Sequence, residues 1–133
     1  MRTSNEYNAP VVTGLYALRH GTPVPNLFHR RDTKIPGVGQ SWSWTDVKRY
    51  WGQTVEVSGG CMGCLLIDRS ALEGFSFILD ELYAPDVPLM RFFNQQGIKQ
   101  MARLDVVCGH EKLNGETIYP DASHLQGYRI DKP

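Results

Sequence analysis

The first apolar run of the chain covers residues 10–18, Pro-Val-Val-Thr-Gly-Leu-Tyr-Ala-Leu. Its β-branched and aromatic residues predict a strand. Gly14 interrupts this run, which predicts a bulge or the close approach of another part of the backbone. Glycine and two prolines mark residues 19–25 as a turn, and a short strand is predicted over residues 26–29.

The next part of the chain predicts a long loop followed by a short helix. Residues 30–42 contain a proline and two glycines and show little periodicity. We expect a loop there, of a length that is typical of binding segments and lids. A short helix is predicted over residues 43–51, with Ser43 or Thr45 as its cap and Gly52 at its end.

The most glycine-rich stretch is Ser-Gly-Gly-Cys-Met-Gly-Cys at residues 58–64. It predicts a loop between two strands, which cover residues 54–57 and 65–67. Residues 68–74 then predict a short helix, with the first residue, an aspartate, as its cap and the last, a glycine, just past its end.

The strongest helix prediction covers residues 87–96. Asp86 is a good N-cap, a proline is tolerated in the first turn, and Gly97 stands just past the end. A strand is predicted over residues 98–107, and beyond it at most one further short strand, over residues 117–119. This order of strands and helices predicts an α/β fold. The 133 residues suit a single domain, residues 1–133.

The composition and charge of the chain limit the kinds of binding partner that the sequence predicts. The 14 basic and 14 acidic residues give a net charge of zero, so charge provides no argument for nucleic acid or an anionic membrane. We expect no membrane span, because no apolar run approaches the roughly 20 residues needed. The polar N-terminus does not resemble a secretory signal, and three cysteines do not predict a disulfide framework. We therefore expect a cytoplasmic protein with free thiols.

Two residues at element ends are candidates for chemistry, each beside a plainer explanation. Asp86 is accounted for by capping alone. The helix dipole also stabilises its carboxylate, which would act as a base only where the local site raises its proton affinity. His110 follows Val-Val-Cys-Gly and is either a metal ligand, since imidazole is the commonest one, or a polar surface residue.

The glycine-rich stretch carries a C-x-x-C pair, Cys61 and Cys64. With Cys108 and His110 the pair offers a zinc site or a redox site. A strand rather than a helix is predicted after it, which favours ordinary packing of the cysteines. The stretch matches no phosphate-binding pattern. Its glycines predict either close approach of backbone to a substrate or a tight turn between strands.

Four segments, taken in order, resemble the C-terminal half of the catalytic domain of GT-A-fold, family-2-like glycosyltransferases. They are the strand at residues 11–16, the glycine-rich loop with its strand and helix at residues 58–73, the helix segment at residues 84–97, and Asp-Val-Val-Cys-Gly-His at residues 105–110. Each motif is short, and their order and spacing carry the resemblance.

The resemblance implies a partial GT-A-like mixed sheet with flanking helices, without the N-terminal nucleotide-binding half. It implies that Asp86 is the catalytic base and that His110 is a ligand to Mn²⁺ or Mg²⁺. The glycine-rich loop would contact the substrates, a nucleotide sugar and a saccharide or other hydroxyl acceptor. The loop residues concerned are Gly59, Gly60, Cys61, Met62 and Gly63.

The sequence departs from the family pattern in two respects. Pro85 stands where the family has glutamate, and no D-x-D motif occurs in the 133 residues. Because hard cations need several oxygen ligands, His110 alone would not hold the metal. We therefore expect the acceptor-side part of a glycosyltransferase, completed by a D-x-D-bearing N-terminal half. That half is a partner if it is encoded separately. The other expected assembly is a homo-oligomer of this chain. The alternative is a catalytically inactive, truncated module that binds a saccharide or a partner protein.

Overall fold

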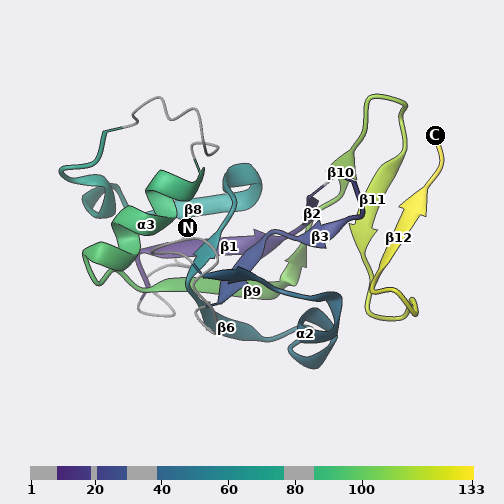
Figure 1. The fold of residues 1–133 in the computed structure, drawn as a ribbon, viewed down its shortest axis with the longest axis horizontal. Coiled ribbons are helices and arrows are strands. Elements are labelled where there is room, and N and C mark those ends of the chain that lie inside the picture. The colour runs from purple at the N-terminus through teal and green to yellow at the C-terminus, as the bar shows by residue number, and fades with distance from the viewer. Residues whose placement is uncertain (1–8, 19–20, 30–38, 77–85) are drawn as a thin grey trace.

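The computed structural model describes residues 9–18, 21–29, 39–76 and 86–133 (Figure 1). Over these residues the fold is mixed α/β, with most of the strands in several small sheets and with few helices. This agrees with the α/β class that the sequence predicts. The strands are β1 (Val11–Leu15), β2 (Ala17–Leu18), β3 (Val24–Pro25), β4 (Leu27–His29), β5 (Gln40–Ser41), β6 (Thr54–Val57), β7 (Gly59–Gly60), β8 (Leu65–Ile67), β9 (Gln100–Val107), β10 (His110–Glu111), β11 (Thr117–Pro120) and β12 (Tyr128–Asp131). The helical elements are α2 (Trp44–Arg49), the 3₁₀ turns η1 (Met62–Cys64) and η2 (Arg69–Leu72), and α3 (Asp86–Gln95).

A mixed four-stranded sheet in the order β6-β9-β1-β8 forms the centre of the described fold. β1 runs parallel to β9 and antiparallel to β8, and β6 runs antiparallel to β9. Figure 1 shows β1 and β9 lying side by side through the middle of the molecule. All five residues of β1 are buried, which explains why its sequence is a nearly continuous apolar run.

Gly14 produces both effects that the sequence predicts for it. The register between β1 and β9 shifts between Thr13 and Leu15, which is a bulge. A Cβ atom at Gly14 would lie 3.1 Å from the backbone oxygen of Val106 and 2.7 Å from Cys64 Sγ, so the missing side chain leaves space for both. The predicted strand over residues 10–18 is therefore two strands, and β2 pairs with β3 after the break.

Helix α3 agrees closely with its prediction. It ends in a Schellman motif, in which Ile98 N–H donates to Phe93 O at 2.9 Å and Gly97 N–H donates to Asn94 O at 3.3 Å. Gly97 has φ +68°, the left-handed conformation that favours glycine. Asp86 is the first helical residue, whereas the sequence places it as the N-cap; the residue before it lies outside the described part of the chain.

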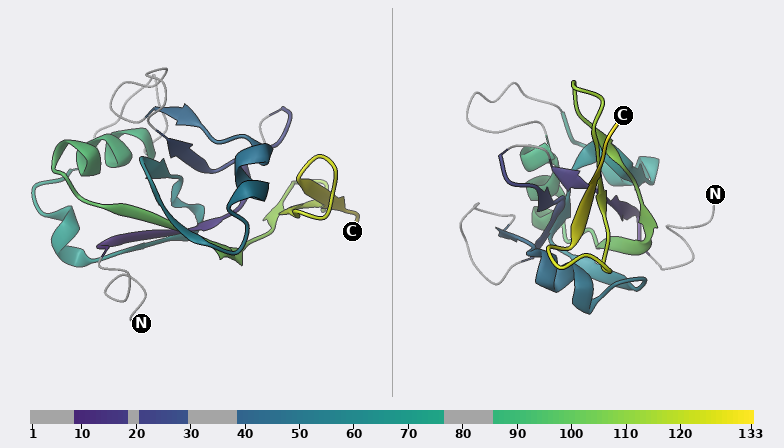
Figure 2. Two further views of the ribbon diagram at one scale, coloured as in Figure 1. Left: turned by 90° about the horizontal axis from the view of Figure 1, so that it is seen from below. Right: turned by 90° about the vertical axis from the view of Figure 1, so that its right-hand side faces the viewer.

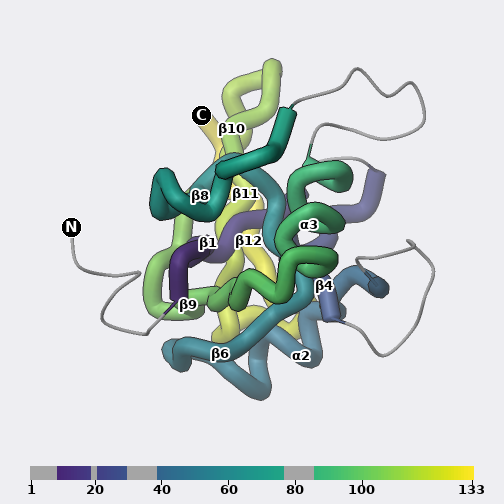
Figure 3. The backbone as a smooth tube through the Cα atoms, turned by 90° about the vertical axis from the view of Figure 1, so that its left-hand side faces the viewer, coloured from purple at the N-terminus to yellow at the C-terminus, as the bar shows by residue number. Residues whose placement is uncertain are grey.

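Apolar side chains attach α3 to the central sheet. Leu89 and Phe93 pack with Val11 of β1 and with half-buried residues of β8. Figure 3 shows α3 beside β8 and β1 at one end of the molecule. The buried face of α3 therefore fixes its first turn, and with it Asp86, relative to β1.

The shorter predicted helices also form, with differences in detail. Ser43 caps α2 in a capping box with Asp46, which confirms the first of the two predicted caps. Residues 69–72 form a 3₁₀ turn, with Asp68 at the N-cap position but without a capping side-chain hydrogen bond. Gly52 and Gly74 have positive φ angles and end these two segments as predicted.

A second core lies between the central sheet, α2 and the small sheet β5-β4-β7. Leu15, Leu27, Val47 and Leu104 are fully buried there. The predicted loop over residues 30–42 lies partly outside the described residues. In the described part of the chain, no helix has the length and apolar character needed to cross a membrane.

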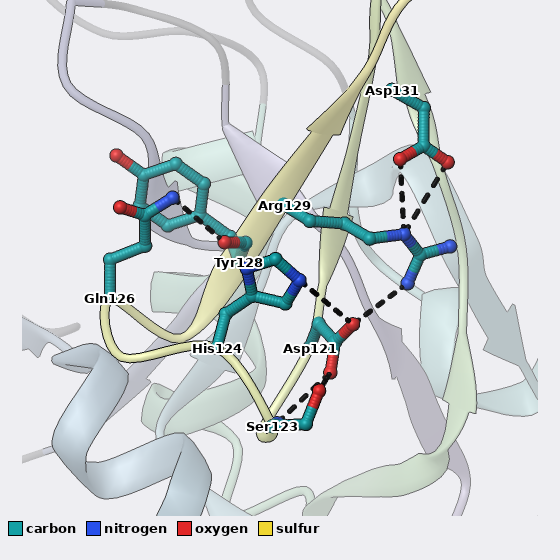
Figure 4. A network of polar contacts seen from close by, with 7 residues as sticks. All are labelled: Asp121, Ser123, His124, Gln126, Tyr128, Arg129 and Asp131. Atoms are coloured by element: carbon teal, nitrogen blue, oxygen red, sulfur yellow. Dashed lines mark hydrogen bonds and ion pairs between the residues drawn. The ribbon is translucent and has the colours of Figure 1, made fainter.

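The C-terminal region contains more structure than its sequence predicts. β10, β11 and β12 form an antiparallel sheet, whereas only residues 117–119 are predicted as a strand. Figure 2 shows this sheet projecting from one end of the molecule. Polar contacts shown in Figure 4 hold it together: Arg129 bonds Asp121 and Asp131, each at 3.1 Å. The guanidinium of Arg129 also lies 4.5 Å from the ring centre of Tyr119.

Candidate functional site

The glycine-rich stretch begins as a packed strand and ends as an exposed turn. Gly59 and Gly60 form β7, which pairs with β4, and both are buried. A Cβ atom at Gly59 would overlap the side chain of Met90, and one at Gly60 would lie 2.6 Å from Thr13 Cγ2. These two glycines let the loop pack closely against α3 and β1. Of the five predicted substrate-binding residues, Met62 and Gly63 are the exposed ones.

Asp86 lies directly opposite this turn, although 24 residues separate it from Met62. Met62 N–H donates to Asp86 Oδ2 at 3.1 Å. Burial, and then the charge of Asp86, raises the pKa of Cys61 to about 12, so Cys61 remains a thiol at neutral pH. The predicted base and the predicted substrate loop are therefore in contact.

Tyr16 joins the same turn to His110, and its sequence context gave no signal of this role. Gly63 N–H donates to Tyr16 Oη at 2.9 Å. The Tyr16 ring meets the His110 ring edge-to-face, with centroids 5.7 Å apart. Burial, with smaller contributions from neighbouring groups such as Cys61, raises the pKa of Tyr16 above its ordinary range, so its hydroxyl stays protonated.

Asn26 positions Tyr16 and is also absent from the sequence prediction. Its side chain is fully buried, accepts from Tyr16 N–H at 3.0 Å, and donates to Gly14 O at 3.0 Å. Its backbone carbonyl accepts from Cys61 N–H at 3.0 Å. One buried amide therefore links the break in β1 to the start of the exposed turn. The only sequence signal is an asparagine that directly precedes an apolar strand.

His110 is the first residue of β10 rather than a loop residue, and it pairs with Ile118. Its Nδ1 lies 2.5 Å from Ala17 O. Because a carbonyl oxygen only accepts, Nδ1 carries the proton in this contact, and the lone pair is then on Nε2. A backbone carbonyl that orients imidazole in this way is a common feature of metal-binding histidines.

The remaining members of the predicted zinc or redox set are Cys64 and Cys108. Their sulfur atoms lie 3.3 Å apart, with the Cys108 thiol donating to Cys64. Burial, and then Cys64, raises the pKa of Cys108 to about 11. Among the residues that the structure describes, no three His, Cys, Asp or Glu side chains lie close enough to hold a metal ion. The structure thus assembles a pair of thiols and one oriented histidine.

A separate groove of about 490 Å³ lies at the other end of α3. Charged and amide side chains line it together with backbone of β6 and β9, and a hollow of about 220 Å³ adjoins it. The groove is lined by His29, Glu56, Val57, Ser58, Asn94, Gly97, Ile98, Lys99 and Gln100. Its volume is within the range of small-molecule sites, about 300–1,000 Å³.

Comparison with known proteins does not assign the chain to a family. No protein-family model matches it, and no curated protein sequence matches it significantly.

Proposed function

We propose that this chain is the acceptor-side part of an inverting glycosyltransferase with a GT-A-like mixed sheet. It would help transfer a sugar from a nucleotide-sugar donor to an acceptor hydroxyl. The observation that supports this proposal is that the four resembling segments meet in the folded chain. Asp86 contacts the turn at Met62, the next residue of that turn contacts Tyr16, and Tyr16 packs on His110.

Asp86 is the catalytic base in this proposal. Its carboxylate is half-buried at the start of α3, and the Met62 N–H holds one oxygen in place. The carboxylate accepts the proton of the acceptor hydroxyl as the hydroxyl oxygen bonds to the anomeric carbon. The bond from that carbon to the nucleoside diphosphate breaks on the opposite face, and inversion follows from this geometry.

His110 fits a metal site as one ligand. Its Nδ1–H donates to Ala17 O, so Nε2 presents its lone pair. A bound Mn²⁺ or Mg²⁺ would neutralise the charge of the leaving diphosphate. The described residues do not offer a cluster of three such ligands, so oxygen ligands must come from a D-x-D-bearing part. That part is another region of the protein or a separately encoded partner.

The decisive experiment supplies this chain with a D-x-D-bearing half and measures sugar transfer with Mn²⁺. Asp86→Asn should lower kcat by about 10²–10⁴-fold, since it removes the base but keeps the side-chain size. Asp131→Asn is the matched control, because Asp131 is exposed on β12 and its carboxylate pairs with Arg129 rather than with the turn at Met62. Unchanged transfer by Asp86→Asn would show that the base is another residue.

The alternative, a catalytically inactive module that binds a saccharide, is favoured by the groove at the end of α3. Glu56 lines both hollows, and carboxylate and amide groups suit sugar hydroxyls. Calorimetric titration distinguishes the two functions. Tight, Mn²⁺-dependent binding of a nucleotide sugar by the chain together with its D-x-D-bearing half, weakened by His110→Ala, would exclude the alternative. Metal-independent binding of oligosaccharides that Glu56→Gln abolishes would support it.

A further inference from the structure

We propose that Cys64 and Cys108 are a covalent modification site, an oxidisable dithiol that closes to an intramolecular disulfide beside the candidate active site. This proposal does not depend on the proposed function, because it rests on the placement of two sulfur atoms. They lie 3.3 Å apart, although 44 residues separate them in the chain. Both side chains are half-buried, so a small oxidant in solution can reach them.

Strand β1 holds both cysteines in this arrangement. Cys108 N–H donates to Leu15 O at 2.8 Å, which fixes the backbone just after β9. Thr13 Oγ1 donates to Cys64 O at 3.1 Å, which fixes the end of η1. The bulge at Gly14 lies between these two anchors, and its missing side chain makes room for Cys64 Sγ. Two neighbouring backbone anchors thus bring the thiols together before any bond forms.

The third cysteine has a different environment. The Cys61 thiol is buried and experiences the charge of Asp86, whereas Cys64 is the sulfur of the C-x-x-C pair that faces Cys108. A pairing across 44 residues, rather than within the C-x-x-C motif, is therefore the geometry that oxidation would trap. Cys61 provides an internal control for the selectivity of the reaction.

The oxidant in this proposal is a small disulfide, such as glutathione disulfide. One thiolate attacks a glutathione sulfur, forming a mixed disulfide and releasing one glutathione thiolate. The second cysteine then attacks the protein sulfur of the mixed disulfide and releases the second glutathione. Two protein thiols lose two electrons and two protons, and one glutathione disulfide becomes two glutathione molecules.

Bond formation would move the candidate site. A disulfide bond is about 2.05 Å long, so the sulfurs must approach each other by about 1.2 Å. Cys64 follows Gly63, which bonds to Tyr16, and Cys108 lies two residues before His110. Closure therefore shifts the exposed turn relative to the histidine, and the redox state of the pair would control their spacing.

The test incubates the full, reduced chain with glutathione disulfide and measures intact mass. Wild type and Cys61→Ser should each lose about 2 Da, the mass of two hydrogens, and regain it with dithiothreitol. Trypsin digestion without reduction should link peptides 50–69 and 104–112. Cys64→Ser and Cys108→Ser should form no internal disulfide, with circular dichroism confirming that they fold.

NMR spectra of the backbone amides give an independent readout. Oxidation should shift the amide signals of Gly63 and His110 in wild type and in Cys61→Ser. Three outcomes would overturn the proposal. The first is that wild type retains three free thiols after equilibration. The second is that Cys61 belongs to the linked pair. The third is that Cys64→Ser or Cys108→Ser still forms an internal disulfide.

Discussion

Asn26 and Tyr16 hold each other through two hydrogen bonds in opposite directions. Tyr16 N–H donates to Asn26 Oδ1 at 3.0 Å, and Asn26 N–H donates to Tyr16 O at 3.1 Å. Asn26 is fully buried, so these bonds are formed away from water. They set the position of Tyr16, whose hydroxyl contacts the exposed turn and whose ring packs against the His110 ring.

Asn26→Ala should destabilise the fold by about 2–4 kcal/mol, because Tyr16 N–H and Gly14 O each lose a buried partner. Urea unfolding followed by circular dichroism measures this loss. Asn114→Ala is the control, since Asn114 is exposed and bonds only within its turn, and it should cost less than about 1 kcal/mol. Equal effects of the two substitutions would contradict the role of the buried amide.

Tyr16→Phe and Asp86→Asn should affect two adjacent amides separately. Tyr16→Phe removes the acceptor of Gly63 N–H, so hydrogen exchange at Gly63 should accelerate about fivefold, equivalent to about 1 kcal/mol. Asp86→Asn weakens the acceptor of Met62 N–H and should accelerate exchange there instead. Each variant serves as the control for the other. A uniform change at both amides would mean that the turn opens as one unit.

Gly60→Ala should destabilise the protein by about 1–3 kcal/mol, because the added methyl group would lie 2.6 Å from Thr13 Cγ2 in a buried region. Thr13→Ser removes that methyl group of threonine and keeps its hydroxyl. In the Thr13→Ser background, the cost of Gly60→Ala should fall by at least about 0.5 kcal/mol. Additive effects in a double-mutant cycle would show that the strain is relieved elsewhere.

Glu116 in the C-terminal sheet should titrate far below its ordinary range. Hydrogen bonds from Lys132, then Asn114 and Lys112, lower the pKa of Glu116 to about 2. Because the folded state favours the ionised carboxylate, this contribution to stability is complete above the ordinary pKa of 4.5. It disappears as the pH falls from there towards 2. Carboxyl ¹³C chemical shifts measure the midpoint. Lys132→Ala should raise it, whereas Lys99→Ala should leave it unchanged.

Local sequence signals predicted much of the described architecture. The Ser43 cap, the left-handed Gly97 and the bulge at Gly14 each follow from a residue whose preferred conformation matches its position. The C-terminal sheet was largely missed. Its strands are short, and hydrogen bonds and ion pairs such as Asp121–Arg129 stabilise it, so hydrophobic periodicity gives little signal there.

Short-range preferences predict the α/β class, the helix that carries Asp86, and the glycine-rich stretch that holds Cys61 and Cys64, because residues close in the chain decide such features. Long-range folding adds three contacts: Asp86 touches this stretch, Tyr16 links it to His110, and Cys64 meets Cys108. These relationships depend on the pairing of β1 with β8 and β9. Strand pairing brings together residues distant in sequence, and no local pattern encodes which ones will meet.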